Sequence, residues 1–381
     1  MRGLAFAAAL AFSWANRAGC CWLAGQDAYT VRPAPAPAAE PAPPSAPALR
    51  AVVFADFGDD TCQQAAVARG LAAAQARAPF DLALSPGDNL YQCGPDTRLP
   101  GAAACDFAPD GATVAPGYAP PEDPRFRGRF EQPLQALAGG AHPLPIYLAL
   151  GNHDVAAWRS CLEGDLPPER AGRVRACLEV AHRSPLWRMP GRHYVLDQGP
   201  ARFIVVDSNV LVQDYGGFTL GQEEAFVREA TRGCDARPCF VVGHHPPASA
   251  GAHADALRPG SPFVERVRRL EEAMSAPVAA WLAGHDHDLQ HVRAARGYDV
   301  FVSGNGSRWR KERFEQVGPP GARLLFASTA WGWAALEVSA AGWSVRFEDP
   351  DGRPLHCCRA TFPGPCQPVA CGPGPSGPAA P

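Results

Sequence analysis

The sequence is poor in lysine. Lys311 is its only lysine, and arginine supplies the other members of its 35 basic residues. Acidic residues number 38, so the formal net charge is −3. A protein that binds nucleic acid through its phosphates needs a concentrated positive field. The composition therefore argues against a nucleic-acid-binding role.

The sequence also lacks a long uninterrupted apolar run. Residues 4–15 form an apolar stretch after Arg2, and this stretch is too short to span a bilayer comfortably. A short charged start followed by such a stretch is typical of a secretory signal, which we place in residues 1–25. Cleavage after Ala15 fits the small-residue rule, and a lipid anchor at Cys20 is the alternative. We expect no later membrane helix and a secreted or extracytoplasmic protein.

Paired C-x-x-C spacings, which are typical of zinc sites, are missing although the chain has 13 cysteines. So many thiols suit an oxidising compartment, and we interpret them as disulfides. Connectivity cannot be read from a sequence, but proximity along the chain suggests three pairs: Cys93–Cys105, Cys161–Cys177 and Cys234–Cys239. The last four cysteines crowd the C-terminus at positions 357, 358, 366 and 371.

Composition and periodicity divide the chain into four parts. A Pro/Ala-rich linker (26–47) follows the signal, a catalytic domain covers 48–348, and a Cys/Pro/Gly-rich tail covers 349–381. Short apolar runs in the domain predict strands at 50–55, 80–85, 146–150, 194–196, 203–206, 240–242, 279–283 and 300–302. Helical patterns lie between them at 63–78, 124–138, 221–231 and 262–275. This alternation predicts an α/β fold.

Polar side chains follow five of the predicted strands. They are Asp56; Asp88 and Tyr91; Asn152 and His153; His244; and His285 and His287. Any one of them has an ordinary explanation as a turn, a helix cap or a surface histidine. Ligand sites in open α/β folds lie on the loops that leave the strands. The repetition of carboxylate, phenol, amide and imidazole groups at these positions therefore predicts a transition-metal site.

In chain order the motifs are Asp56-Phe57-Gly58, Gly87-Asp88-Asn89-Leu90-Tyr91, Gly151-Asn152-His153-Asp154, Gly243-His244-His245-Pro246 and Gly284-His285-Asp286-His287. This series resembles the calcineurin-like metallophosphoesterases. Most members have Asp-x-His in the first motif, but here Gly58 replaces that histidine and Tyr91 follows Asp88. This combination is similar to the purple acid phosphatases, and residues 283–290 resemble their tartrate-resistant branch. The resemblance covers residues 48 to about 347 and implies two mixed β-sheets packed as a sandwich flanked by helices.

The resemblance also implies a dinuclear metal centre with Fe(III) in one position and divalent Fe, Zn or Mn in the other. The ferric ion would be held by Asp56, Tyr91, His287 and the bridging Asp88. The divalent ion would be held by Asp88, Asn152, His244 and His285. Two oxygen ligands and a shared carboxylate suit a hard trivalent ion, whereas two imidazoles and an amide suit a softer divalent one.

Three further residues are candidates for contact with substrate. His153 follows a predicted ligand without being one, and we expect it to protonate the leaving alcohol, with Asp154 orienting its ring. His253 falls where the tartrate-resistant branch has a histidine that supports phosphate binding, although its spacing alone is equally consistent with a loop residue. Asn89 is a third expected substrate contact. His245 is either an extra phosphate contact or a neighbour of the ligand His244.

These assignments predict a secreted acid phosphatase in which a metal-bound hydroxide attacks a phosphate monoester. Its substrates would be small phosphorylated molecules or phosphoproteins. One alternative keeps the site and changes the substrate to phosphodiesters or nucleotides, because the motifs bind the phosphoryl group only. The loops decide between these substrates, and segments 92–121 and 156–187 depart most from the family pattern, so the resemblance implies least about substrate preference there. A second alternative is an inactive secreted binding module on a phosphatase scaffold.

Overall fold

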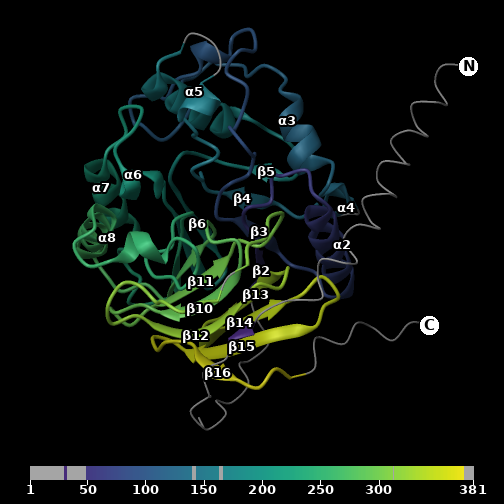
Figure 1. Cartoon of the computed structure of the whole chain (residues 1–381), viewed down its shortest axis with the longest axis vertical. Helices are drawn as coiled ribbons and strands as arrows, with labels where there is room; N and C mark the ends of the chain where they lie inside the picture. Colours follow the sequence, from purple (N-terminus) through teal and green to yellow (C-terminus); the bar gives the residue numbers. More distant parts are fainter. Residues whose placement is uncertain (1–29, 32–48, 140–142, 163–165, 312, 373–381) are drawn as a thin grey trace, which may run out of the picture.

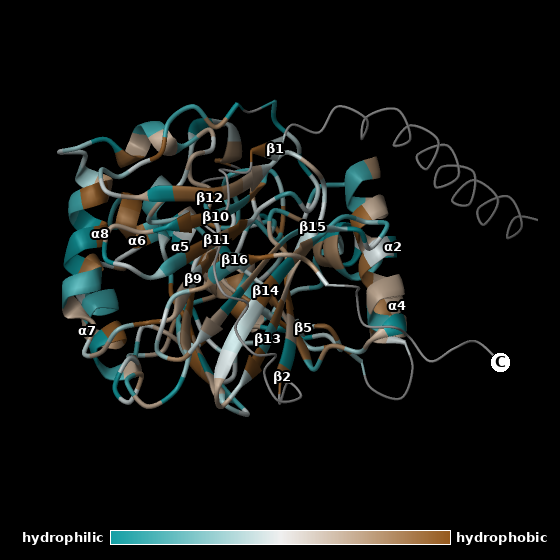
Figure 2. Cartoon of the chain, turned by 90° about the horizontal axis from the view of Figure 1, so that it is seen from below, coloured by the Kyte–Doolittle hydropathy of each residue, from teal (hydrophilic) through white to brown (hydrophobic). Residues whose placement is uncertain are grey.

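Two eight-stranded β-sheets form the centre of the protein (Figure 1). The computed structural model describes residues 30–31, 49–139, 143–162, 166–311 and 313–372. The predicted signal, most of the predicted linker and the last nine residues therefore lie outside the described residues. In Figure 2 the strands lie between α7 and α8 on one side and α2 and α4 on the other.

One sheet begins the domain and also ends it. Its strand order is β16-β15-β14-β13-β2-β3-β4-β5, with β2 to β5 parallel and the others antiparallel. The strands are β2 (Leu49–Val53), β3 (Leu82–Ser85), β4 (Ile146–Leu148), β5 (Trp187–Arg188), β13 (Trp333–Ser339), β14 (Gly342–Glu348), β15 (Pro354–Thr361) and β16 (Gln367–Val369).

The other sheet has the order β1-β12-β10-β11-β9-β8-β7-β6. Its parallel strands are β7, β8, β9 and β11. The strands are β1 (Thr30–Val31), β6 (Tyr194–Gln198), β7 (Ala201–Val205), β8 (Cys239–Val242), β9 (Ala280–Ala283), β10 (Leu289–Arg293), β11 (Asp299–Ser303) and β12 (Arg323–Ser328).

Helices cover the outer faces of the two sheets. They are α2 (Cys62–Arg77), α3 (Pro124–Phe126), α4 (Gln135–Ala138), α5 (Pro168–Ala181), α6 (Asn209–Val212), α7 (Leu220–Ala230) and α8 (Pro262–Ala273). Short 3₁₀ turns are η1 (Ala102–Ala104), η3 (Arg159–Cys161) and η4 (Ala254–Leu257), and η2 (Arg127–Glu131) is a π-helical turn. The Thr61 hydroxyl caps α2 by accepting the Gln64 amide at 3.1 Å.

Alternation along the strands divides the apolar residues between two cores. Val53 of β2 and Leu282 of β9 belong to the core between the two sheets. Val52, one residue earlier on β2, points the other way and packs in the core under α2 with Leu71. A sheet buried on both faces explains why these strands read as continuous apolar runs. The predicted sandwich flanked by helices is confirmed.

Several elements lie where the sequence analysis predicted no strand or helix, among them β10, β12, β13, β14 and α6. β15 and β16 extend the first sheet within the predicted tail, and β1 pairs with β12 from within the predicted linker. Helix α5 lies in segment 156–187, for which no helix was predicted. Among the described residues, no helix is both long and apolar enough to cross a membrane.

The described residues form five disulfides, and two of the three predicted pairings are wrong. Cys234–Cys239 is confirmed, whereas Cys93 pairs with Cys161 and Cys105 with Cys177. The tertiary structure brings the 92–121 segment against the 156–187 segment, with Cα–Cα distances of 5.3 and 5.8 Å across these bonds. Near the C-terminus the pairs are Cys357–Cys371 and Cys358–Cys366.

Candidate metal centre

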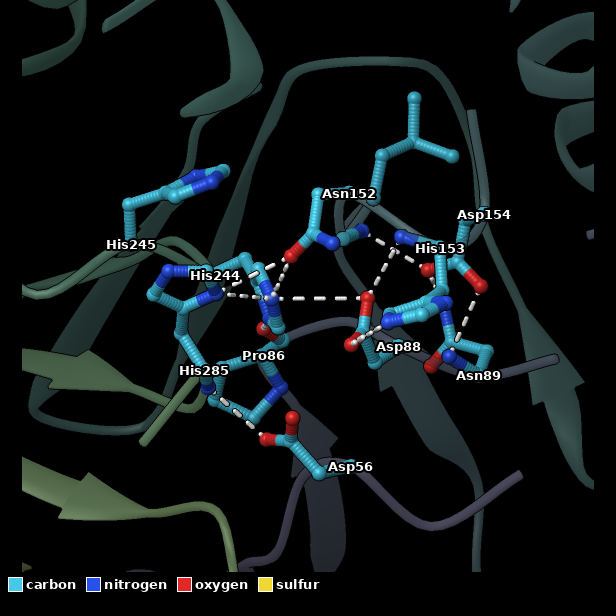
Figure 3. Close-up of polar contacts among 12 residues, drawn as sticks. Asp56, Pro86, Asp88, Asn89, Asn152, His153, Asp154, His244, His245 and His285 are labelled. Atoms are coloured by element: carbon cyan, nitrogen blue, oxygen red, sulfur yellow. Dashed lines mark hydrogen bonds and ion pairs between the residues drawn. The ribbon is translucent and has the colours of Figure 1, made fainter. Parts of the chain in front are cut away.

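The seven predicted metal ligands come together at one edge of the sandwich. Figure 3 shows Asp56, Asp88, Asn152, His244 and His285 of this set. Three neighbouring strands of one sheet, β2, β3 and β4, lead to Asp56, Asp88 with Tyr91, and Asn152. Two neighbouring strands of the other, β8 and β9, lead to His244 and to His285 with His287. Parallel strands place their carboxyl ends on the same edge, so the loops of both sheets meet there.

The backbone is strained at three of these strand ends. Asp56, Asp88 and His285 have φ values of 56°, 54° and 73°, and they are three of the four non-glycine residues with positive φ in the described chain. A side chain other than glycine pays of order 1–3 kcal/mol for such a conformation. The surrounding structure holds these residues where their side chains turn toward each other. Strain of this kind concentrates at functional sites.

One triad of donor atoms is formed by Asp56, Tyr91 and His287. The Tyr91 hydroxyl donates to Asp56 Oδ1 at 2.8 Å and lies 3.2 Å from His287 Nε2. His287 Nε2 lies 3.4 Å from the same Asp56 oxygen. The other Asp56 oxygen accepts the His285 backbone amide at 2.9 Å. The carboxylate is thereby fixed in orientation.

A second triad is formed by Asn152, His244 and His285. Asn152 Oδ1 lies 2.9 Å from His244 Nε2 and 3.0 Å from His285 Nδ1, and the two ring nitrogens are 3.2 Å apart. His244 Nδ1 donates to the Pro86 carbonyl at 3.0 Å. This bond leaves the Nε2 lone pair of His244 facing the other two atoms, as in metal-binding histidines.

Asp88 connects the two triads. Its Oδ1 lies 3.4 Å from His244 Nε2 and accepts the His153 backbone amide at 2.9 Å. Ligand atoms of Asp56, Asp88 and His244 lie within 4.8 Å of one another, and so do those of His244, His245 and His285. Asp88 is therefore in the place of a ligand shared by two cations.

The spacing within each triad fits a metal ion. Ligands at roughly 2.1 Å from a metal are about 3.0 Å apart at 90° and about 3.4 Å apart in a tetrahedron, from the usual bond lengths to nitrogen and oxygen. The observed separations run from 2.8 to 3.4 Å. Asp56 and Asp88 are fully buried, and no arginine or lysine of the described chain forms an ion pair with either. A buried carboxylate needs such compensation, which cations would supply.

Electrostatics around the triads also favour cations. Burial raises the pKa of Asp56 to about 8, because the charged form is poorly solvated there. Burial and the neighbouring carboxylates of Asp56 and Asp88 hold the pKa of Tyr91 well above its usual range. Burial lowers the pKa of His285 well below its usual range and that of His287 to about 4. Both imidazoles are therefore neutral and keep a lone pair for a metal.

Gly58 explains why the first motif lacks a histidine. A Cβ atom at this position would lie 1.7 Å from the Asn89 carbonyl oxygen. No side chain can therefore be accommodated there without moving the loop that follows β3. That loop carries Asp88 and Tyr91, so the close approach at Gly58 sets the position of two predicted ligands.

His153 lies beside the bridging carboxylate. Its Nδ1 donates to the Gln92 carbonyl at 2.6 Å, and its Nε2 is 4.0 Å from Asp88 Oδ2. The ring is 4.3 Å from that of Tyr91. The predicted orienting role of Asp154 is wrong, since the Gln92 carbonyl holds the ring. Asp154 is buried and accepts the backbone amides of Asn89, Leu90 and Gly151 instead.

Asn89 does not face the site. It is fully buried, and its side-chain amide nitrogen lies within hydrogen-bonding distance of the Ala149 carbonyl, Asp154 and Glu179. Its side-chain oxygen is 2.8 Å from the Ser85 hydroxyl. The prediction that Asn89 contacts substrate is therefore wrong. Its amide groups hold the β3 loop against the loop that follows β4.

His253 reaches the site from a distant loop. Its ring stacks on His285 with centroids 3.9 Å apart, and its Nδ1 donates to Asp286 Oδ1 at 2.8 Å. Asp286 is fully buried, and the Ser249 hydroxyl also donates to it. The ring of His253 is thus fixed beside a predicted ligand, with its Nε2 3.4 Å from Arg310.

His245 is buried next to the second triad. Its ring centroid lies 4.6 Å from that of His285 and 5.0 Å from that of His244. The Ser208 hydroxyl accepts its backbone amide at 2.9 Å and lies 2.9 Å from its Nδ1. These two bonds fix the ring. The sequence alternatives for His245, an extra phosphate contact or a neighbour of the ligand, both remain compatible with this position.

Two arginines near the centre were missed by the sequence reasoning. The Arg308 guanidinium lies 3.9 Å from the Tyr91 ring centroid and pairs with Asp59 at 2.9 Å. Arg310 approaches His253. Three of the four residues from Arg308 to Lys311 are basic, and this cluster of positive charge was the sequence feature that could have indicated them. These side chains place positive charge beside the first triad.

A cavity of about 910 Å³ opens beside the second triad. Asn152, His245, His253 and His285 form part of its wall. Much of the remaining wall comes from segments 155–158 and 168–172 and from α6 and α8. The candidate metal centre therefore adjoins a cavity large enough for a small organic ligand.

Solved structures support the fold. The Plasmodium protein described as GAP50, the anchor in the inner membrane complex, has a TM-score of 0.59 at 17% identity, over 82% of this chain and 88% of that one. A purple acid phosphatase from yellow lupin seeds has a TM-score of 0.53 at 14% identity. That match covers 82% of this chain and 53% of the lupin chain. At these identities the likeness concerns the fold alone.

Curated relatives at low identity are acid phosphatases. Human tartrate-resistant acid phosphatase type 5 is 23% identical over 341 residues, which cover 82% of this chain and 91% of the human protein. Purple acid phosphatase 7 of Arabidopsis thaliana is 24% identical over 331 residues, or 81% of this chain and 84% of the plant protein. The sequence profile of the calcineurin-like phosphoesterases matches residues 49–289. The chain therefore belongs to the calcineurin-like phosphoesterase family.

Proposed function

We propose that the protein is an exported acid phosphatase that hydrolyses phosphate monoesters at a pair of metal ions. The observation that carries this proposal is the pair of donor triads joined by Asp88, with buried carboxylates that no arginine or lysine of the described chain neutralises. The acid phosphatases among the curated relatives support the reaction. Five disulfides support export to an oxidising compartment.

The two triads suit different ions. The carboxylate of Asp56 and the phenol of Tyr91 are hard oxygen ligands, so with Asp88 and His287 they would hold ferric iron. The imidazoles of His244 and His285 would hold a divalent ion together with Asn152 and Asp88. Two bound ions of this kind clamp a phosphate, activate a water and stabilise negative charge on the entering and leaving oxygens.

The protein's own residues would handle the proton and the phosphate. His153 is oriented by Gln92 so that its Nε2 faces the centre, which suits it to protonate the leaving alcohol. His253, held by Asp286, would contact a phosphate oxygen from the side of His285. Arg310, next to His253, would add positive charge there.

The test is a spectrum combined with turnover. Purified protein should contain iron and show a visible charge-transfer band between tyrosinate and Fe(III). Tyr91→Phe should abolish this band, whereas Tyr298→Phe should keep it because Tyr298 is half-buried elsewhere and its hydroxyl donates to Glu271. The protein should hydrolyse phenyl phosphate much faster than diphenyl phosphate.

Each alternative function predicts a different outcome. Faster turnover of the diester would favour a phosphodiesterase at the same site. Protein without iron or a second metal, and without turnover, would favour an inactive binding module. A band that is unchanged by Tyr91→Phe would remove the purple acid phosphatase assignment.

A further inference from the structure

The cavity beside the second triad has a wall that is mainly apolar. Trp158, Leu257 and Phe263 line it together with Val155, Val212 and several alanine and proline residues. Trp158 is 39% exposed and Val212 is 51% exposed, so the wall offers apolar surface that a ligand can cover. Because the predicted ligands Asn152 and His285 form one end, a phosphate held at the metals would direct its ester group into this space.

The charged groups of the wall are acidic. Glu169, near the start of α5, is exposed, and Asp214 is paired with Arg266. The described lining contains no arginine or lysine. The nearby cations of the centre lie elsewhere, with Arg308 over Tyr91 and Arg310 beside His253. An anionic group placed in this cavity would therefore lose its hydration without gaining a cationic partner.

Disulfides anchor the part of the wall that departs most from the family pattern. Two disulfides, Cys93–Cys161 and Cys105–Cys177, attach segment 156–187 to the loop after β3. The cavity wall includes Trp158 and Glu169 of this segment and Val155 just before it. The Arg175 guanidinium donates to the carbonyls of Ala156 and Cys161 and further fixes this segment. The wall is thus held in place independently of any substrate.

We propose that this cavity binds the alcohol group of the substrate and selects phosphate monoesters whose alcohol is apolar, uncharged and small enough to enter. The inference rests on the proposed function and narrows its substrate class. It disfavours nucleotides and acidic phosphopeptides, whose second anionic groups would meet an apolar and acidic wall. A cavity of about 910 Å³ has room for a substituted aromatic ring.

Two substrates of matched reactivity test the proposal. 4-Propylphenyl phosphate and 4-(2-carboxyethyl)phenyl phosphate have leaving phenols of similar acidity and similar shape, and only the second carries a carboxylate. We expect kcat/KM to favour the propyl compound by about 30-fold or more, because an unpaired carboxylate is costly in an apolar site. A ratio near one would overturn the proposal. Faster turnover of an acidic phosphotyrosine peptide would also overturn it.

A pair of variants locates the selectivity. Val212→Lys places a cation in the wall and should lower the ratio about tenfold by pairing with the carboxylate. Val195→Lys is the matched control, since Val195 is also an exposed valine at 38% and lies outside the lining. Equal ratios in the two variants would overturn the role of the cavity.

Binding measurements separate this inference from the proposed function. The two corresponding benzylphosphonates cannot be hydrolysed, and calorimetry gives their affinities directly. Preference for the propyl phosphonate, reduced by Val212→Lys, supports the cavity even if no ester is turned over. Turnover of phenyl phosphate without any preference between the phosphonates would overturn the cavity inference and leave the phosphatase proposal standing.

Discussion

Two of the clusters of histidine and carboxylate in the described chain differ in how their charges are compensated. The first is the candidate metal centre around Asp56 and Asp88. The second, which we call the C-terminal cluster, consists of His291, His356, Asp299 and Arg293. Ligand atoms of His291, His356 and Cys358 lie as close together as those of the first cluster, within 4.8 Å. Proximity alone therefore does not distinguish the two.

The C-terminal cluster satisfies its own polar groups. Asp299 accepts the Arg293 guanidinium at 2.7 Å and the Cys366 backbone amide at 2.7 Å, and His291 Nε2 lies 2.9 Å from it. His291 Nδ1 is 2.9 Å from His356 Nε2, and Cys358 is held in a disulfide. In the candidate metal centre, by contrast, no arginine or lysine of the described chain pairs with Asp56 or Asp88. A buried carboxylate without a cationic side chain beside it indicates a metal site better than the mere proximity of ligand atoms does.

The largest effect expected from this difference concerns the bridging carboxylate. Asp88→Asn should remove both metals, because Asp88 is the predicted shared ligand. Turnover should fall by about a thousandfold or more, because residues that act as one catalytic unit lose their effect together. Asp299→Asn is the matched control, because it changes a buried aspartate of the other cluster. Elemental analysis of the folded fractions should find metals in this control and none in Asp88→Asn. Similar metal contents in the two variants would contradict the distinction between the clusters.

A smaller effect separates two adjacent residues of the candidate centre. His153→Ala should slow turnover by about 100-fold with both metals kept, because the ring serves in proton transfer. Asn152→Ala should lower the metal content from two ions toward one, since Asn152 Oδ1 is central to the second triad. Metal analysis and kcat with phenyl phosphate check both expectations. Equal metal loss in the two variants would argue against the role of His153.

The gathering of the seven candidate ligands was predictable from sequence because its signal is local. Each predicted ligand follows a short apolar run, and parallel strands bring the ends of such runs together, so the seven positions required no knowledge of packing. The direction in which a loop side chain points depends instead on contacts with other segments of the chain. Asn89 was expected to face substrate, yet Ser85, Asp154 and Glu179 hold it inside the protein.

Helix α5 shows why other parts could not be predicted. Its sequence buries Arg175 and Glu179 completely, so its buried face does not read as apolar. Arg175 donates to the carbonyls of Ala156 and Cys161, and Glu179 accepts the Asn89 side-chain amide, and all three partners lie outside the helix. The same packing decides the disulfides, since Cys93 and Cys105 pair across to Cys161 and Cys177. Only tertiary contacts determine these features.

The smallest expected effect tests the C-terminal cluster through stability. Arg293→Gln should lower the free energy of unfolding by about 3 kcal/mol, because Asp299 would keep its buried charge without the guanidinium. Arg232→Gln is the control: Arg232 is 66% exposed and pairs with Glu229 on the surface, so its loss should cost less than about 1 kcal/mol. Denaturant unfolding gives both values, and metal content should stay unchanged in both. Release of metal by Arg293→Gln without a change in stability would mean that the C-terminal cluster is coupled to the candidate metal centre. The pairing of Asp299 with Arg293 would then not explain why the two clusters differ.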